Sequence, residues 1–121
     1  MKSKNTIVLG ASDNPQRYSY IALNKLKAYG HPVVAIGKKT SRVNDIDIIT
    51  GMPEVSNVNT ITLYLNPANQ KPYLDYILSL KPERIIFNPG SENPELASLA
   101  KQNGIATLEA CTLVLLSTNQ Y

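Results

Sequence analysis

The sequence contains little of several residue types on which particular activities depend. Its single cysteine cannot form an internal disulfide, so a reducing cytoplasm is the expected compartment. With one histidine and one cysteine, a zinc site is not expected either. Tryptophan is absent, phenylalanine occurs once, and the seven tyrosines form no evident stacking platform of the kind that binds single-stranded nucleic acid.

Long apolar runs are also missing. No segment approaches the roughly 20 apolar residues that span a bilayer, and residues 1–5 contain no apolar core of a secretory signal. A chain of 121 residues that is 43% hydrophobic, with a mean hydropathy of -0.16, is long enough for one core and too short for two. We therefore expect a soluble protein in which residues 1–121 form a single domain.

The charge of the chain is mildly positive, with a net charge of +3 and an isoelectric point of about 9.0. Apart from Lys38, Lys39 and Arg42, the basic residues are scattered along the sequence. Such scatter does not favour a nucleic-acid or membrane partner, and it is consistent with a solvated surface or with one small anionic ligand.

Short apolar runs alternate with helical patterns. Runs typical of buried strands occur at residues 7–9, 33–36, 60–65, 84–87 and 105–109. Apolar residues at helical spacing predict helices at 17–29, 69–80 and from Pro94 to Gly104. Residues 40–59 are the hardest to interpret, with at most a short extended piece at 46–49. The alternation predicts an α/β fold, a Rossmann-like three-layer sandwich around a mainly parallel five-stranded sheet.

The two ends of this predicted sheet differ in composition. Ligands in such sheets bind at the carboxyl ends of the strands, where the strand order reverses. Small residues, hydroxyl groups and lysines follow the predicted strands at that end, whereas ordinary connecting turns occupy the other. The only histidine, His31, falls in one of those turns, which argues against a His-dependent catalytic triad. We interpret His31 as a turn residue.

The turn after the first strand has the form of a phosphate cradle. A buried strand, the small residues Gly10-Ala11-Ser12 and a helix start bring unpaired backbone N–H groups together. The dinucleotide fingerprint is only partly present, because Ser12 and Pro15 occupy its second and third glycine positions. A plain turn in which Ser12 bonds its own backbone remains the alternative.

The end of the second strand bears on the choice of nucleotide. An NAD-binding domain usually places an acidic residue there to bond the ribose diol, whereas this chain has Gly37, Lys38 and Lys39. Lysines attract a phosphate on the ribose, which NADP and coenzyme A both carry. A solvated pair of surface lysines is the alternative interpretation.

Taken in order, these pieces resemble the small stand-alone CoA-binding proteins of Rossmann type, which are related to the CoA-binding domain of the succinyl-CoA synthetase α-subunit. The resemblance covers nearly the whole chain. Two positions depart from it: the second strand ends Ile36-Gly37-Lys38 instead of in a Val-Asn-Pro type sequence, and Ala110 stands where many relatives have arginine. The matching segments are Val8-Leu9-Gly10-Ala11-Ser12, Asn14-Pro15, Arg17 to Ser19, Asn66-Pro67, Asn88-Pro89-Gly90-Ser91-Glu92-Asn93 and Glu109-Ala110-Cys111.

The resemblance implies a binding site for coenzyme A. Residues of the first turn would hold the pyrophosphate, the two lysines the ribose phosphate, and the loops after the third and fourth strands the rest of the cleft. For those two loops, helix caps and turns are equally open interpretations. The implied cofactor-binding residues are Gly10, Ala11, Ser12, Asp13, Arg17, Ser19, Gly37, Lys38, Lys39, Asn66, Pro67, Asn88, Pro89, Gly90, Ser91 and Cys111.

The sequence indicates no catalytic or metal-binding set. Glu92 and Glu109 are candidate acids without a nucleophile to pair with. Cys111 falls where the pantetheine arm would end, and could form a mixed disulfide with its thiol, or it is a small buried hydrophobe. The alternatives to a CoA-binding protein are an NADP-dependent oxidoreductase and a regulatory or interaction module, homodimeric through the apolar segment 113–116.

Overall fold

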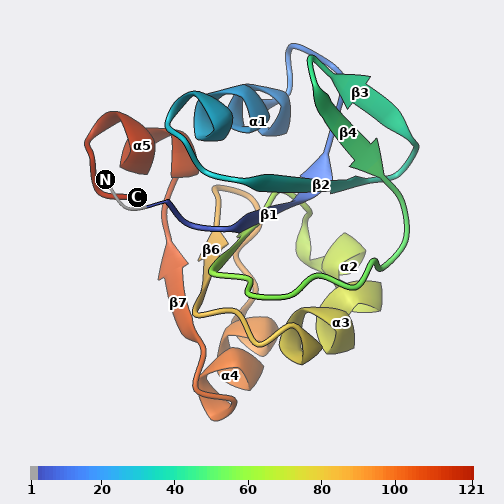
Figure 1. Ribbon diagram of the computed structural model, residues 1–121. Coiled ribbons are helices and arrows are strands. Elements are labelled where there is room, and N and C mark those ends of the chain that lie inside the picture. Colours follow the sequence, from blue (N-terminus) through green and yellow to red (C-terminus); the bar gives the residue numbers. More distant parts are fainter. Residues whose placement is uncertain (1–2) are drawn as a thin grey trace.

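The computed structural model describes residues 3–121 and shows a sheet between two layers of helices (Figure 1). Seven strands are arranged in the order β3-β4-β2-β1-β5-β6-β7, and all neighbours are parallel except the antiparallel pair β3 and β4. The strands are β1 (Thr6–Ala11), β2 (Val33–Gly37), β3 (Ser41–Val43), β4 (Ile46–Ile49), β5 (Thr60–Leu63), β6 (Arg84–Phe87) and β7 (Ala106–Glu109).

The predicted α/β class and Rossmann-like sandwich are confirmed, with two strands more than predicted. The additional strands form a hairpin in the stretch that was hardest to interpret. Its turn is Asn44-Asp45, and the positive φ of Asn44 is one that asparagine tolerates well. In β4, Ile46 and Ile48 are buried while Asp47 between them is exposed, the alternation expected of a strand with one covered face.

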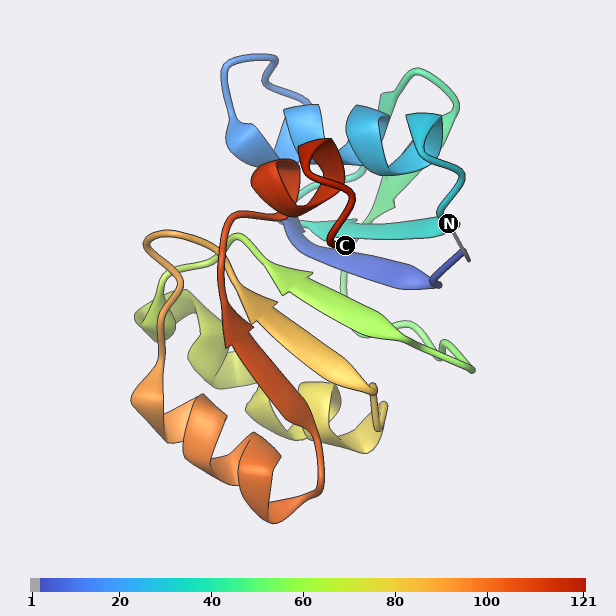
Figure 2. The ribbon, with the colours of Figure 1, turned by 90° about the vertical axis from the view of Figure 1, so that its left-hand side faces the viewer.

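Helices cover both faces of the sheet. On one face lie α1 (Tyr18–Ala28) and α5 (Thr112–Ser117), and on the other lie α2 (Pro67–Gln70), the 3₁₀ turn η1 (Lys71–Tyr73), α3 (Leu74–Ser79) and α4 (Pro94–Gln102) (Figure 2). Successive residues of β1 serve the two layers, because Ile7 and Leu9 pack toward α3 and α4 while Val8 packs toward α1 and α5. None of the helices in residues 3–121 has the length and apolar character needed to cross a membrane.

Two helical segments differ from their predicted form. The predicted helix at 69–80 is divided into α2, η1 and α3 because Pro72 has no N–H to continue the helical hydrogen bonding. The apolar segment 113–116 lies within α5, where Leu116 is fully buried and Val114 is 56% exposed. Much of the apolar surface of that segment therefore packs in the core.

The strand order reverses at β1. The chain runs from β1 outward through β2 to the hairpin, and then returns to place β5 on the other side of β1. The turns that follow β1 and β5 diverge from this point, which leaves a crevice at the carboxyl ends of the central strands.

Candidate functional site

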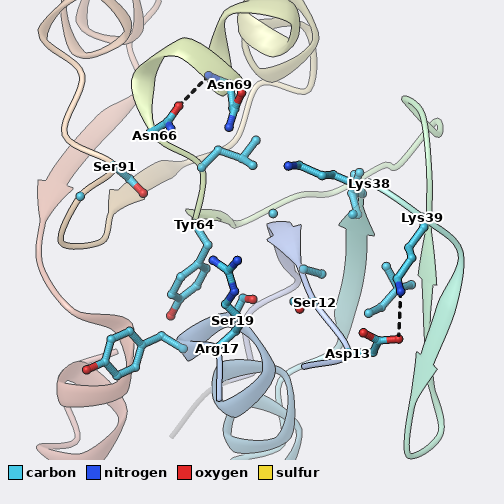
Figure 3. Close-up of a pocket in the computed structure, with 18 of the residues that line it drawn as sticks. Ser12, Asp13, Arg17, Ser19, Lys38, Lys39, Tyr64, Asn66, Asn69 and Ser91 are labelled. Carbon is cyan, nitrogen blue, oxygen red and sulfur yellow. Dashed lines mark hydrogen bonds and ion pairs between the residues drawn. The ribbon is translucent and has the colours of Figure 1, made fainter. Parts of the chain in front are cut away.

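A cleft of about 710 Å³ lies at the carboxyl ends of the central strands, within the usual range for small-molecule sites. Its walls come from the turn after β1, the start of α1, the loop after β2, and the loops after β5 and β6 (Figure 3). Arg17, Lys38 and Lys39 supply positive charge, and Asp13 is the one acidic side chain among the described residues that line it. The lining therefore favours an anionic ligand.

The start of α1 leaves an anion-binding position unfilled. Arg17 at the N-cap makes no side-chain capping bond, and the first turn contains no acidic residue. The first backbone N–H groups of a helix have no acceptor within it, and the helix dipole makes this end positive. Ser19, on this first turn, is buried and borders the cleft. This end of α1 is therefore suited to a phosphate.

The turn between β1 and α1 is held by its own polar side chains. The Ser12 hydroxyl oxygen accepts a hydrogen bond of 3.1 Å from the N–H of Asn14, and the Asn14 carboxamide accepts one of 3.0 Å from Gln16. The alternative noted for Ser12, bonding to its own backbone, thus occurs. Its hydroxyl hydrogen is still able to donate to another acceptor.

Asp13 connects this turn to the loop and hairpin that follow β2. The Ser41 hydroxyl donates a 2.6 Å hydrogen bond to Asp13 Oδ2. The Lys39 ammonium lies 3.9 Å from the same oxygen (Figure 3). The Ser41 hydrogen bond, and then the charge of Lys39, hold the pKa of the Asp13 carboxyl below its usual value. Asp13 is therefore an ionised group beside a cleft that favours anions.

Glycines let the chain pass close to its neighbours at two points. Gly10 has a φ of +97°, and a Cβ there would lie 3.0 Å from the backbone carbon of Tyr64. A Cβ on Gly37 would lie 2.5 Å from the carbonyl oxygen of Ala11 and 2.8 Å from Ile48. Both glycines are required by the packing of the strand ends that form the cleft.

A buried polar network supports the wall formed by the loop after β6. The Asn88 side chain donates to Thr62 Oγ1 at 2.7 Å and to the Leu63 carbonyl at 2.8 Å, and accepts from the N–H of Thr112 at 2.9 Å. Gln70 donates to the carbonyls of Leu65 and Ser91 at 2.8 and 2.7 Å. These bonds fix the loops after β5 and β6 against each other and against the start of α5.

Tyr64 separates that network from the cleft. Its ring lines the cleft, while its hydroxyl is buried without a hydrogen-bond partner in the described part of the chain. Burial raises the pKa of this phenol well above its usual value. Tyr64 is thus a neutral, largely apolar wall next to the cationic groups.

The structure brings most of the predicted site residues together. Pro67, Asn88 and Cys111 lie outside the lining: Pro67 starts α2, Asn88 is buried 2% exposed behind the wall, and Cys111 is the half-buried N-cap of α5. Four asparagines in the loops at this end are followed by proline: Asn14, Asn66, Asn88 and Asn93. The predicted residues that line the cleft are Gly10, Ala11, Ser12, Asp13, Arg17, Ser19, Gly37, Lys38, Lys39, Asn66, Pro89, Gly90 and Ser91.

Sequence reasoning missed several other lining residues. Asn69 and Tyr73 are four positions apart in successive short helical segments, a spacing that pointed to one common face. Ser41 lies in the hairpin that was not predicted. The further lining residues are Tyr18, Ile36, Ile48, Tyr64 and Leu65.

A second hollow, of about 610 Å³, lies at the amino end of β2. Asp45 and Asp47 are part of its lining, and their carboxylates pair with Lys27 and Arg42. The basic side chains near this hollow are thus already engaged, so it is less suited to a phosphorylated ligand than the cleft.

Comparison with known families identifies the chain. The model of a family described as the CoA binding domain matches residues 4–117. The chain belongs to the CoA-binding domain family. The match spans both the phosphate-cradle turn after β1 and the loop after β6, so the CoA-binding domain includes every wall of the cleft.

Solved structures support the assignment of the fold. One described as an uncharacterized protein is 45% identical, covers 100% of both chains and has a TM-score of 0.97. A hypothetical protein from Pyrococcus horikoshii OT3 is 18% identical, with a TM-score of 0.86 over 97% of this CoA-binding domain and 84% of its own chain. A protein from Thermus thermophilus is 18% identical, with a TM-score of 0.81 over 98% of this chain and 91% of its own. None of the curated proteins is significantly similar to the chain.

Proposed function

We propose that this protein binds coenzyme A or an acyl-CoA in the cleft at the carboxyl ends of β1, β2 and β5. One observation carries the proposal: the uncapped N-terminus of α1 and the two lysines of the loop after β2, Lys38 and Lys39, line the same cleft. A ligand with a pyrophosphate and a separate ribose phosphate suits two such anion positions. Membership of the CoA-binding domain family supports the same ligand.

The proposed roles follow the walls of the cleft. The N–H groups of the turn from Gly10 to Asp13, with Arg17 and Ser19, hold the pyrophosphate. The loop after β2, which carries Lys38 and Lys39, holds the ribose phosphate. Asn66 and the segment from Pro89 to Ser91 border the remainder of the ligand, and Asn88 positions that segment from behind through its three hydrogen bonds.

We propose a binding role without catalysis by this chain alone. The cleft of residues 3–121 brings no histidine or cysteine to its surface, and its carboxylate, Asp13, is bonded to Ser41 and paired with Lys39. We also propose that residues 1–121 act as a single CoA-binding domain in the cytoplasm.

Calorimetric titration and thermal unfolding with CoA, NADP and NAD test the proposal. CoA is expected to bind and to raise the melting temperature by mass action, since a ligand at 100 times its Kd stabilises a protein by about 2.7 kcal/mol. NAD is expected to give no shift. No shift from either ligand would refute CoA binding, and equal shifts from CoA and NAD would refute a site selective for CoA.

A pair of variants locates the binding in the cleft. Lys38→Ala removes a lining ammonium, whereas Lys101→Ala removes one from the exposed end of α4. CoA affinity should fall in Lys38→Ala and stay unchanged in Lys101→Ala. Equal losses of CoA affinity in the two variants would mean that the ligand binds elsewhere, or that the effect comes only from the change in net charge.

NADP-dependent hydride transfer is the second candidate, supported by the same lysines. It is tested by following NADPH oxidation with a range of carbonyl substrates. Native mass spectrometry of the purified protein for a retained nucleotide separates the two, because CoA and NADP differ in mass. Light scattering tests the homodimer proposed through residues 113–116.

A further inference from the structure

The two lysines of the cleft differ in their surroundings. Lys39 is turned toward Asp13 and lies 3.9 Å from its carboxylate, whereas Lys38 extends in another direction across the cleft (Figure 3). No ion pair to Lys38 occurs among residues 3–121. Side by side in sequence, the two ammonium groups are therefore not equivalent for a ligand.

The position of Asp13 is fixed by more than the ion pair. The Ser41 hydroxyl holds Asp13 Oδ2 at 2.6 Å, and Ser41 begins β3 in the hairpin next to the cleft. Because this hydrogen bond is made to the same oxygen that faces Lys39, the carboxylate stays beside that lysine. A carboxylate lining an anion site repels phosphate unless a cation neutralises it.

We propose that Asp13 is a specificity-determining residue of the CoA site, which neutralises Lys39 and leaves Lys38 to bind the ribose phosphate alone. The inference rests on the proposed function, since it concerns how that same cleft distinguishes CoA from dephospho-CoA. Without Asp13, the cleft would contain three cations with no nearby carboxylate, Arg17, Lys38 and Lys39, and its preference for the phosphorylated ribose would be stronger. Asp13 thereby limits that preference.

The ratio of the affinities for CoA and dephospho-CoA is the measurement that tests this, because the two ligands differ only in the ribose phosphate. Asp13→Asn keeps an oxygen for the Ser41 hydrogen bond and removes the charge. It should raise the ratio by roughly three- to tenfold. Asp47→Asn is the matched control: it makes the same change in net charge, at a carboxylate that pairs with Arg42 outside the cleft. It should leave the ratio unchanged.

Two further variants separate the lysines. Asp13→Asn combined with Lys39→Ala removes a neutral pair, so the ratio should stay within about twofold of the wild type. Lys38→Ala should bring the ratio close to one. If the double variant loses the preference for CoA over dephospho-CoA, Lys39 binds the phosphate itself and the proposal is overturned. An unchanged affinity ratio in Asp13→Asn would overturn it as well.

The failure of this inference is distinguishable from failure of the proposed function. If the folded wild type binds neither CoA nor dephospho-CoA, the proposed function fails. If it binds both and the Asp13→Asn ratio equals that of Asp47→Asn, CoA binding stands and the role of Asp13 is refuted.

Discussion

The two ends of the sheet use polar and charged residues in opposite ways. At the carboxyl ends, the cations and hydroxyl groups of the cleft face open space, and the start of α1 has no capping side chain. At the amino ends, Thr6, His31 and Arg84 gather around Tyr121, which is 5% exposed, and in residues 3–121 only His31 Nε2 and Arg84 Nη2 of this cluster are buried without a hydrogen-bond partner. Polar groups that bury each other contribute to stability, whereas those left facing a cleft are available to a ligand.

The cluster at the amino ends is built around the Tyr121 ring. Its hydroxyl is hydrogen-bonded to Thr6 Oγ1 at 2.6 Å, its ring centre lies 4.7 Å from that of His31, and the Arg84 guanidinium lies 4.4 Å above it. His31 is 2% exposed and accepts a 3.0 Å hydrogen bond at Nδ1 from the N–H of Lys4. We therefore expect substitutions here to change unfolding and those in the cleft to change binding.

The largest effect is expected from Tyr121→Ala. It removes a buried ring that contacts Thr6 of β1, the turn residue His31 and Arg84 of β6. The substitution should cost about 3–5 kcal/mol of unfolding free energy, while CoA affinity of the folded protein stays within about twofold. Denaturant unfolding and titration calorimetry measure the two. Tyr121→Phe is the matched control, because it removes only the bond to Thr6 and should cost about 1 kcal/mol. A large loss of CoA affinity in the folded Tyr121→Ala variant would contradict the separation between a stabilising amino end and a ligand-binding carboxyl end.

Asn88→Ala sharpens the comparison, because Asn88 lies at the carboxyl end but is buried like the residues of the amino end. It removes three hydrogen bonds and leaves the buried N–H of Thr112 without its acceptor, while Thr62 Oγ1 keeps Thr112 Oγ1 and the Leu63 carbonyl keeps the Ser91 hydroxyl. The expected cost is about 2–3 kcal/mol in denaturant unfolding. Asn66→Ala removes an exposed asparagine that caps α2, and should cost about 1 kcal/mol or less. Equal costs in the two variants would contradict a supporting role for the Asn88 network.

Arg17→Ala should show the reverse behaviour. Arg17 is exposed at the start of α1 and lines the cleft, so its loss should weaken CoA binding about tenfold and leave the unfolding midpoint unchanged. Arg42→Ala is the control, since Arg42 pairs with Asp47 outside the cleft. Titration calorimetry that found the same affinity in both variants would exclude Arg17 from the site.

The smallest effect is a pH dependence from His31. Burial, and then the charges of Lys4 and Arg84, lower the pKa of this imidazole from its ordinary value of 6.5. Between the lowered pKa and 6.5 the unfolded chain binds more protons than the folded one, so stability is complete above 6.5 and falls as the pH decreases through this window. Unfolding of wild type and His31→Gln at pH values from about 5 to 7.5 checks this. If the unfolding free energies of the two proteins change with pH in parallel, His31 contributes nothing to the pH dependence of stability.

Helices α1 and α4 and the central strands could be predicted because each pattern is local. The apolar runs of β1, β2, β5 and β6 and the capped start of α4 at Asn93-Pro94 require only neighbouring residues to be recognised. Of the hairpin, only a short extended piece at 46–49, the residues of β4, was suggested by the sequence. The pairing of β3 with β4 could not be predicted, because each strand is short and only Val43, Ile46 and Ile48 contribute to the core.

The lining of the cleft was predictable where residues directly follow a strand, as for Ser12 and Lys38. It was not predictable where the residue acts through a distant partner. Nothing local distinguishes Lys39 from Lys38, because the difference comes from Asp13 and Ser41 folding next to one of them. His31 falls in a turn as interpreted, but its burial depends on Tyr121, ninety positions away in the sequence.

The asparagine-proline pairs at the carboxyl ends affect where the protein is chemically modified during storage. Asparagine deamidates when the backbone nitrogen of the next residue attacks its side-chain carbonyl, and a proline nitrogen has no hydrogen to give up. Asn14, Asn66, Asn88 and Asn93 are shielded from this reaction by the prolines that follow them. Asn103, exposed and followed by Gly104 at the other end of the sheet, is open to it. During storage, new negative charge should therefore gather at Asn103, far from these four positions.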